Sequence, residues 1–278
     1  MEMNRREFLV GGAALAVAGC AHLPAGSFDG RRTVRIVHCG DPQFGFGKGS
    51  SEDGYRGDVE LFERVIDEVN RLKPDLCFIA GDMTDRTDFL ERDWPRLIRL
   101  FKVPFVVAPG NHDMGNNVTR ENLERFERVF GYEYKSLKVG PWRFLSCNSQ
   151  YWRPTEEKVR QARYEQWLAD ELAKASAAGE PVIIGAHMSP FVRRPDEPDD
   201  YENYPKAGRA ARLDLYERGG VKFYLSGHTH RVYMRSERGI MMLNAETTCW
   251  NFDGRPFGFR LLTLDDSGGY TWDFHGVV

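Results

Sequence analysis

The sequence has little of several features that would each restrict its class. The net charge is −3 over 278 residues, so the basic surplus that a nucleic acid polymer requires is lacking and no such partner is expected. The cysteines show no CxxC pair or metal-finger spacing, and the chain has no internal repeat. The longest apolar run, near the N-terminus, is shorter than the ~20 residues that span a bilayer. What is present is a globular composition, 41% hydrophobic and 28% charged, with enough length for one large core or two smaller ones.

The first 26 residues differ in composition from the rest of the chain. An Arg5-Arg6 pair precedes an apolar run of small residues, which is the order found in export signals. The sequence NRREFL resembles the twin-arginine signal of a pathway that carries folded proteins. The sequence VAGC, which ends at Cys20, resembles a bacterial lipobox and implies cleavage before Cys20 and lipidation of its thiol. A plain cleaved signal or a buried N-terminal helix is the alternative.

These N-terminal motifs define the expected domain organisation and location. We predict a signal peptide at residues 1–19, a lipidated Cys20 with a tether at 20–32, and one catalytic domain at 33–278. Because several acyl chains together anchor a protein stably, we expect an exported, periplasmic protein of the bacterial cell envelope that is attached to the membrane through Cys20. A monomer is expected.

From residue 33 onward, strand-like apolar runs alternate with helical patterns, an order that is typical of α/β domains. Strands are predicted at 33–39, 76–80, 105–108, 143–147, 182–186 and 223–226. Helices are predicted around 59–69, 94–101, 123–130 and 160–178. Short strands with glycine turns follow from 232 to 274, with no helix signal. The pattern favours an α/β domain with a mixed sheet, or two packed sheets, and helices outside.

The cysteines that follow the signal are predicted to be buried free thiols, because most of them lie in apolar strand-like runs. They are Cys39, Cys77, Cys147 and Cys249.

Polar side chains repeatedly follow the predicted strands at the point where each strand ends. A single Asp after Gly usually caps a turn, and a lone His is more often structural than a ligand. Here, however, five strand ends share the feature, and ligands in α/β sheets bind beyond the carboxyl ends of strands. Histidines mixed with carboxylate and amide oxygens suit first-row divalent metals. The residues are Asp41 and Gln43; Asp82, Asp85 and Arg86; Asn111 and His112; His187; and His228 and His230.

The order D-x-Q, G-D-x-x-D, G-N-H-D, a lone His after a strand and G-H-x-H resembles the signature of calcineurin-like metallophosphoesterases from Val34 onward. The resemblance implies a four-layered β-sandwich with mixed sheets flanked by helices, and two divalent metal ions at the strand ends. It implies that His112 meets the transferring phosphate or leaving group and that Asp85 orients His112. The implied ligands are Asp41, Gln43, Asp82 and His230 for the first metal, and Asp82, Asn111, His187 and His228 for the second, with Asp82 bridging.

Gln43 departs from the common pattern of that family, which has His at this position. The form D-P-Q-F-G resembles a subset of the family, the calcineurin-like phosphoesterase domain-containing proteins, so the replacement does not imply an inactive site. The carbonyl oxygen of Gln is a harder ligand than an imidazole nitrogen. Mn or Fe is therefore favoured, with Zn and Mg as alternatives.

A mechanism follows from the implied pair of metals. Two ions ~3.5–4 Å apart share a water, lower its pKa and direct it at phosphorus. His112, oriented by Asp85, then protonates the leaving oxygen. Arg86 is a candidate to hold a phosphate oxygen, and a surface salt bridge is the competing interpretation.

The expected function is that of an exported phosphoesterase, most simply one that hydrolyses small phosphate monoesters. A phosphodiesterase or nucleotide pyrophosphatase would use the same ligands, and a metal-containing binding lipoprotein that has lost turnover through Gln43 is a further alternative. Three segments, 44–57, 189–206 and 244–258, are expected to form the rim of the pocket. In the last of them, Trp250 and Phe252 either stack on an aryl or nucleobase group or pack at the edge of the C-terminal sheet.

Overall fold

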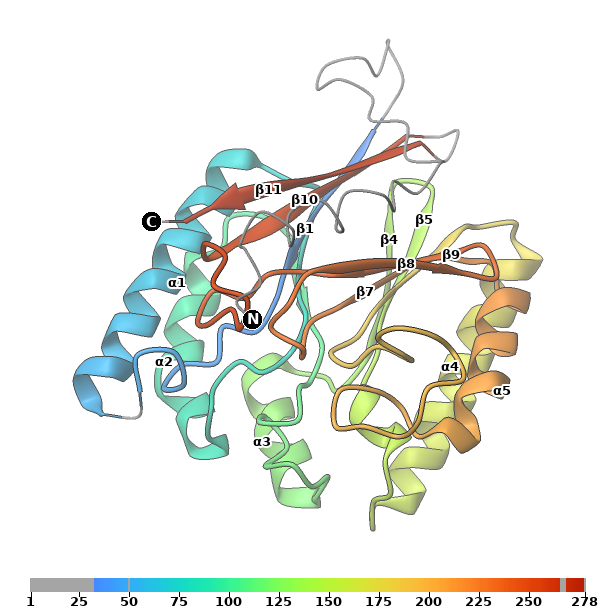
Figure 1. Cartoon of the computed structure of the whole chain (residues 1–278), viewed down its shortest axis with the longest axis horizontal. Coiled ribbons are helices and arrows are strands. Elements are labelled where there is room, and N and C mark those ends of the chain that lie inside the picture. The colour runs from blue at the N-terminus through green and yellow to red at the C-terminus, as the bar shows by residue number, and fades with distance from the viewer. Residues whose placement is uncertain (1–32, 50, 266–268, 278) are drawn as a thin grey trace, which may run out of the picture.

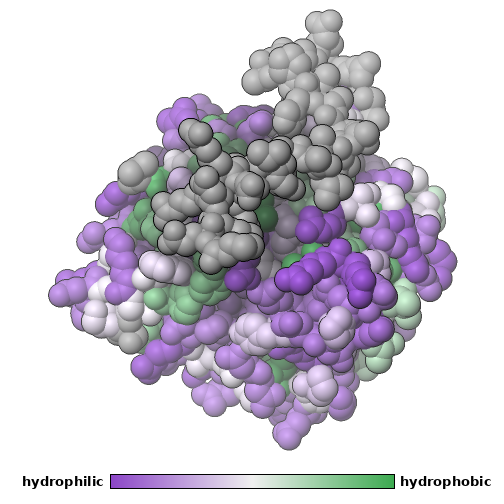
Figure 2. All heavy atoms as spheres, in the orientation of Figure 1, coloured by the Kyte–Doolittle hydropathy of each residue, from purple (hydrophilic) through white to green (hydrophobic). Residues whose placement is uncertain are grey.

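The computed structural model describes residues 33–49, 51–265 and 269–277. The predicted signal peptide, Cys20 and tether lie outside the described residues, so export and lipidation stay predictions. No helix within the described ranges is long and apolar enough to cross a membrane. The face of the molecule in Figure 2 is mostly hydrophilic, with smaller hydrophobic areas between.

Two mixed β-sheets face each other and helices cover their outer sides (Figure 1). The first sheet has the order β11-β10-β1-β2-β3. Its strands are β1 (Val34–Cys39), β2 (Leu76–Ile79), β3 (Phe105–Val107), β10 (Gly258–Leu264) and β11 (Tyr270–Gly276). The second sheet has the order β4-β5-β6-β7-β9-β8. Its strands are β4 (Lys135–Val139), β5 (Trp142–Ser146), β6 (Val182–Gly185), β7 (Val221–Ser226), β8 (Tyr233–Glu237) and β9 (Ile240–Asn244).

The helices begin and end at residues with capping chemistry. Ser51 accepts a hydrogen bond from the backbone N–H of Gly54 at the start of the first helix, and Thr119 does the same for Asn122 at the third. Gly131 ends the third helix in the left-handed conformation. The helices are α1 (Glu52–Leu72), α2 (Leu90–Leu97), α3 (Arg120–Phe130), α4 (Lys158–Ala177) and α5 (Lys206–Arg218), with short 3₁₀ turns η1 (Thr87–Phe89), η2 (Ile98–Leu100) and η3 (Ser149–Trp152).

Alternation along the strands divides the core into inner and outer layers. On β1, Ile36 belongs to the apolar cluster between the sheets, whereas Val37 belongs to the cluster beneath the helices. On β2, Phe78 and Ile79 divide in the same way. Since successive side chains of a strand point to opposite faces, both faces of these strands are buried. The layered fold class predicted from the sequence is confirmed.

The predicted strands and helices are present with small changes at their ends. Sequence reasoning missed β4, a short strand of sequence KSLKV at the edge of its sheet, and α5, whose apolar residues show weak helical periodicity. The second part of segment 44–57, which was expected to form part of the pocket rim, is helical, because α1 begins at Glu52. The cysteines predicted to be buried free thiols are buried and free.

Candidate metal centre

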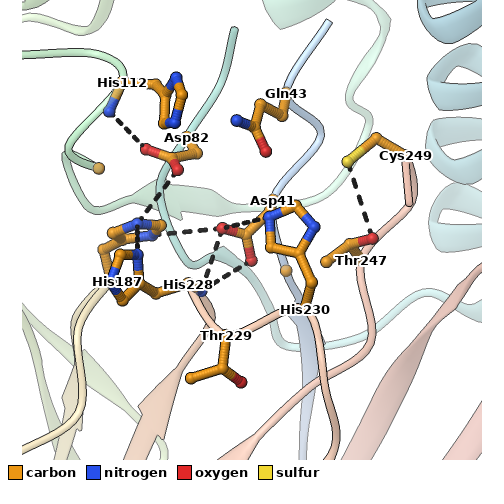
Figure 3. A network of polar contacts seen from close by, with 12 residues as sticks. Asp41, Gln43, Asp82, His112, His187, His228, Thr229, His230, Thr247 and Cys249 are labelled. Carbon is orange, nitrogen blue, oxygen red and sulfur yellow. Dashed lines mark hydrogen bonds and ion pairs between the residues drawn. The ribbon is translucent and has the colours of Figure 1, made fainter. Parts of the chain in front are cut away.

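The loops that follow β1, β2, β3, β6 and β7 bring the predicted ligands into one buried cluster (Figure 3). Asp41 and His187 are fully buried, and His228, the most exposed of the set, reaches only 6%. The cluster thus joins residues that are up to 189 positions apart, from Asp41 to His230. The seven predicted ligands are Asp41, Gln43, Asp82, Asn111, His187, His228 and His230.

The glycines that precede the ligands let the backbone pass close to the carboxylates. A Cβ atom added at Gly227 would lie 2.3 Å from Oδ2 of Asp41, and one at Gly110 would lie 2.0 Å from Oδ1 of Asp82. Both distances are too short for any side chain other than hydrogen. The predicted ligands Gln43 and Asp82 also have positive φ angles of 37° and 49°, a backbone strain that clusters at functional sites.

Asp82, Asn111, His187 and His228 form the tighter part of the cluster. Nε2 of His187 lies 3.2 Å from Oδ2 of Asp82 and 3.0 Å from Oδ1 of Asn111. The same nitrogen is 3.1 Å from Nδ1 of His228. One ligand atom from each of Asp82, His187 and His228 fits within 4.8 Å of the others, which suits a single cation. This set is the one predicted for the second metal.

Each histidine of the cluster uses one ring nitrogen on a backbone carbonyl. Nδ1 of His187 lies 2.6 Å from the carbonyl oxygen of Ala80, and Nδ1 of His230 lies 2.6 Å from that of Trp250. Nε2 of His228 lies 2.9 Å from the carbonyl oxygen of Tyr201. Because a carbonyl only accepts, the bonded nitrogen carries the proton and the other nitrogen offers a lone pair to the cluster. Metal-binding histidines have this arrangement.

The remaining residues, Asp41, Gln43 and His230, lie beside the first group. Both carboxylate oxygens of Asp41 accept from the backbone N–H of His228 at 3.0 Å, and Nε2 of His230 is 4.0 Å from Oδ1 of Asp41. Oε1 of Gln43 is buried without a hydrogen-bond partner among the described residues. In Figure 3 the Gln43 side chain extends toward Asp41. Since a buried unpaired oxygen is costly, a cation beside it fits this donor set.

Asp85 fixes which end of the Gln43 amide faces the cluster. Nε2 of Gln43 lies 3.4 Å from Oδ1 of Asp85, and a carboxylate accepts but does not donate. The amide nitrogen therefore faces Asp85, and the oxygen is left for the cluster. This orientation is the one in which Gln43 serves as a hard oxygen ligand.

Replacing Gln43 by His is expected to raise the affinity for Zn relative to Mn by about 10-fold, because an imidazole nitrogen replaces a hard oxygen. His tolerates the positive φ of this position better than most residues. Competition of Zn and Mn for the purified protein, with activity in each metal, measures the change. Gln166→His, an exposed change on α4, is the control. An unchanged Zn-to-Mn preference would remove Gln43 from the ligand set.

The electrostatics of the cluster favour cations. Burial raises the pKa of Asp41 above its ordinary value, and burial together with Asp82 raises the pKa of Asp113 to about 7. Burial opposes the charge of Asp82 as well, but the neighbouring histidines, His187 foremost, outweigh it and hold its pKa below the usual range. Several carboxylates thus share one buried site, and divalent cations would relieve their mutual repulsion.

His112 stands at the edge of the cluster with its ring tied to Asp85. Its Nδ1 lies 2.9 Å from the carbonyl oxygen and 3.2 Å from Oδ1 of Asp85, and its backbone N–H donates to Oδ1 of Asp82 at 2.8 Å. Burial lowers the pKa of the ring, but the Asp85 hydrogen bond and the Asp82 charge prevail and raise it to about 10. The side chain is 23% exposed, so the free Nε2 can reach a substrate.

Arg86 follows the pattern of a surface salt bridge. Its guanidinium pairs with Asp88 at 2.8 Å and lies over the Phe89 ring at 4.9 Å, with 57% of the side chain exposed. Among the described residues, its guanidinium makes no hydrogen bond or ion pair with the predicted ligands. Arg153, by contrast, is half-buried, has no ion pair among the described residues, and lies over the Tyr201 ring at 5.2 Å.

Two residues that sequence reasoning did not select also shape the site. The Tyr201 hydroxyl accepts from Nδ2 of Asn111 at 2.7 Å while its carbonyl holds His228, so one rim residue orients two ligands. Asp113 accepts from the backbone N–H groups of Met83 and Gly110, each at 2.8 Å, and ties together the loops after β2 and β3. The G-N-H-D motif contains Asp113, so a local sequence signal for this residue existed. For Tyr201 the only signal was the aromatic content of segment 189–206.

The chain is similar to known phosphoesterases in sequence and in fold. The family model described as calcineurin-like phosphoesterase matches residues 34–232. The chain is 30% identical to the human serine/threonine-protein phosphatase CPPED1, over 81% of this chain and 78% of the relative. It is 31% identical to a probable glycerophosphodiester phosphodiesterase, GpdQ, from Arcobacter nitrofigilis, over 64% of this chain and 65% of that protein. A dimetal phosphatase structure from Danio rerio has the same fold, with a TM-score of 0.60 at 14% identity over 88% of this chain and 96% of that chain.

Proposed function

Because the chain belongs to the calcineurin-like phosphoesterase family, we propose that this metal-dependent phosphoesterase hydrolyses phosphate monoesters. The observation that supports the proposal is the arrangement of His112. Its proton-bearing Nδ1 is committed to Asp85, and its Nε2 stands free beside a cluster of cation ligands. A group so placed can give a proton to an alkoxide as the alkoxide leaves the phosphate.

We assign the residues to the two metals as the family resemblance implies. Asp41, Gln43, Asp82 and His230 would hold the first ion, and Asp82, Asn111, His187 and His228 the second. When bound, two divalent ions supply Lewis-acid stabilisation of the phosphate oxygens and lower the pKa of a water. We propose Mn or Fe, with Zn and Mg as alternatives, because four of the seven proposed ligands are oxygen donors.

The chain's own residues then account for the proton balance. A water oxygen forms the new bond to phosphorus and the water releases one proton to solvent, while the ester P–O bond breaks and the proton held at Nε2 of His112 ends on the departing alcohol. His112 then takes a proton back from solvent, so the net change is hydrolysis alone. Asp85 stabilises the charged imidazolium before this transfer through two contacts to Nδ1. Asn111 provides an amide oxygen without adding negative charge, which limits repulsion of the anionic substrate.

The relatives support two versions of this chemistry. CPPED1 is named a serine/threonine-protein phosphatase, which acts on monoesters. GpdQ is named a phosphodiesterase, and it is equally similar to this chain over a shorter span. Diester hydrolysis is therefore the second candidate.

Assays of the Mn-loaded enzyme with butyl phosphate, bis-p-nitrophenyl phosphate and a cyclic nucleotide distinguish the candidates. We expect the highest kcat/KM with the monoester, after allowance for the reactivity of nitrophenolate as a leaving group. Turnover of the diesters without turnover of butyl phosphate would contradict the monoesterase proposal and favour the phosphodiesterase. Metal binding without turnover of any of them would indicate a binding protein.

We further propose that the enzyme is a monomeric lipoprotein of the bacterial cell envelope that acts on small phosphate esters. The proposal rests on the twin-arginine and lipobox resemblances around Cys20. Fractionation of cells that express the whole chain or a Cys20→Ala variant tests it. Retention of both forms in the cytoplasm would contradict export.

A further inference from the structure

Exposed aromatic side chains gather around the metal centre. The described residues contain eight exposed large hydrophobic side chains, and four of them belong to the three rim segments. Isolated exposed apolar residues are ordinary on a protein surface, but a concentration at one site indicates contact with a ligand. The four are Phe46, Tyr201, Trp250 and Phe252, which are 36%, 52%, 48% and 51% exposed.

Phe46 and Phe252 form a continuous wall on one side of the centre. Their ring centroids are 6.4 Å apart in an edge-to-face arrangement. Phe252 stacks on His230 at 4.9 Å, and Phe46 meets the same imidazole edge-to-face at 5.4 Å. Phe252 is thus not packed at the edge of the C-terminal sheet, which was one of the two interpretations of its segment. It is fixed to the site through its backbone N–H, which donates to the His230 carbonyl at 3.1 Å.

The wall lies beside His112. The Phe46 ring is 6.5 Å from the ring of His112, the residue that would protonate the leaving oxygen. An alcohol attached to that oxygen would therefore extend past His112 along Phe46 and Phe252. Because both side chains are partly exposed, they offer edge-to-face or offset stacking to another ring.

We propose, on the basis of the proposed function, that Phe46 and Phe252 make the enzyme selective for phosphate esters whose leaving alcohol carries an aromatic ring. Arg231 borders the wall, because its guanidinium lies over Phe252 at 5.4 Å while it pairs with Glu202 at 2.8 Å. Since Glu202 balances the charge of Arg231, the contact that Phe46 and Phe252 offer the leaving group is mainly apolar.

Benzyl phosphate and butyl phosphate test the assignment, because both release an alkoxide and differ mainly in the ring. For the wild-type enzyme loaded with Mn, we expect kcat/KM for benzyl phosphate to exceed that for butyl phosphate by about 10-fold, the sum of two aromatic contacts. Phe46→Ala and Phe252→Ala are each expected to lower this ratio by about 3- to 5-fold, mainly through KM. Phe46→Leu, which keeps apolar bulk without a ring, is expected to lower it as well.

The controls separate ring recognition from damage to the site. Mn affinity is measured for every variant, because Phe252 packs on the ligand His230. We expect the Mn affinity to stay unchanged. Phe274→Ala removes an exposed aromatic ring on β11 that makes no ring contact with Phe46 or Phe252, and it should keep the ratio.

Benzylphosphonate and butylphosphonate are not hydrolysed, so the ratio of their binding affinities measures the preference for a ring without turnover. Equal ratios in the wild type and in both alanine variants, by turnover and by phosphonate binding, would overturn the aromatic assignment and leave the monoesterase proposal in place. Failure to hydrolyse either monoester, with diesters hydrolysed, would overturn the monoesterase proposal. In that case a benzylphosphonate preference lost in the variants would still support the wall as a site for aromatic groups.

Discussion

Replacing Asp82 by Asn is expected to lower kcat/KM by at least about 10³-fold, more than the loss of a residue that only positions a ligand. Asp82 is the one residue assigned to both metals, and its two oxygens already have separate tasks. Oδ1 accepts from the backbone N–H of His112, and Oδ2 faces His187 at 3.2 Å. An amide can keep one of these contacts, but it is neutral and offers a single acceptor oxygen. It therefore cannot bridge two cations.

Metal analysis makes the Asp82 prediction specific. Asp82→Asn is expected to bind less than two equivalents of Mn per chain, as measured by calorimetry and by elemental analysis after gel filtration. Asp170→Asn, which removes a carboxylate from an exposed position on α4, is expected to match the parent in both activity and metal content. An Asp82→Asn protein with parental turnover would refute the bridging assignment.

The sequence allowed the fold and the set of candidate ligands to be predicted because both follow from local signals. Apolar strands ended by Gly-Asp, Gly-Asn or Gly-His are short patterns, and the carboxyl ends of neighbouring parallel strands meet at the same edge of a sheet. The glycines proved to matter for a reason that no pattern states. At Gly110 and Gly227 a Cβ would overlap the carboxylates of Asp82 and Asp41.

What the sequence could not supply was the orientation of side chains supported from distant positions. Tyr201 lies 90 residues from Asn111, and nothing local to either residue signals their hydrogen bond. The direction of the Gln43 amide likewise depends on Asp85, 42 positions away. Arg86 shows that a neighbour in the chain need not be a side chain's partner in the structure. Its place beside Asp85 in the chain suggested a phosphate contact, yet its guanidinium pairs with Asp88, two residues on.

Replacing His112 by Ala is expected to lower kcat for butyl phosphate by about 10²- to 10⁴-fold, the usual contribution of a general acid. The loss should depend on the leaving group. Nitrophenolate needs little protonation as it departs, so kcat for p-nitrophenyl phosphate should fall by about 10-fold or less. Mn affinity should be unchanged, because the contact from His112 to Asp82 comes from the backbone N–H, which Ala retains.

This dependence on the leaving group separates proton donation from a merely structural role for His112. A residue that only supports the loop after β3 would, when removed, slow both substrates by a similar factor. His275→Ala, which removes an imidazole on β11 that faces Glu68 at 3.9 Å, is the control and should leave both rates at the parental level. Equal losses for butyl and p-nitrophenyl phosphate in His112→Ala would assign the proton to another group.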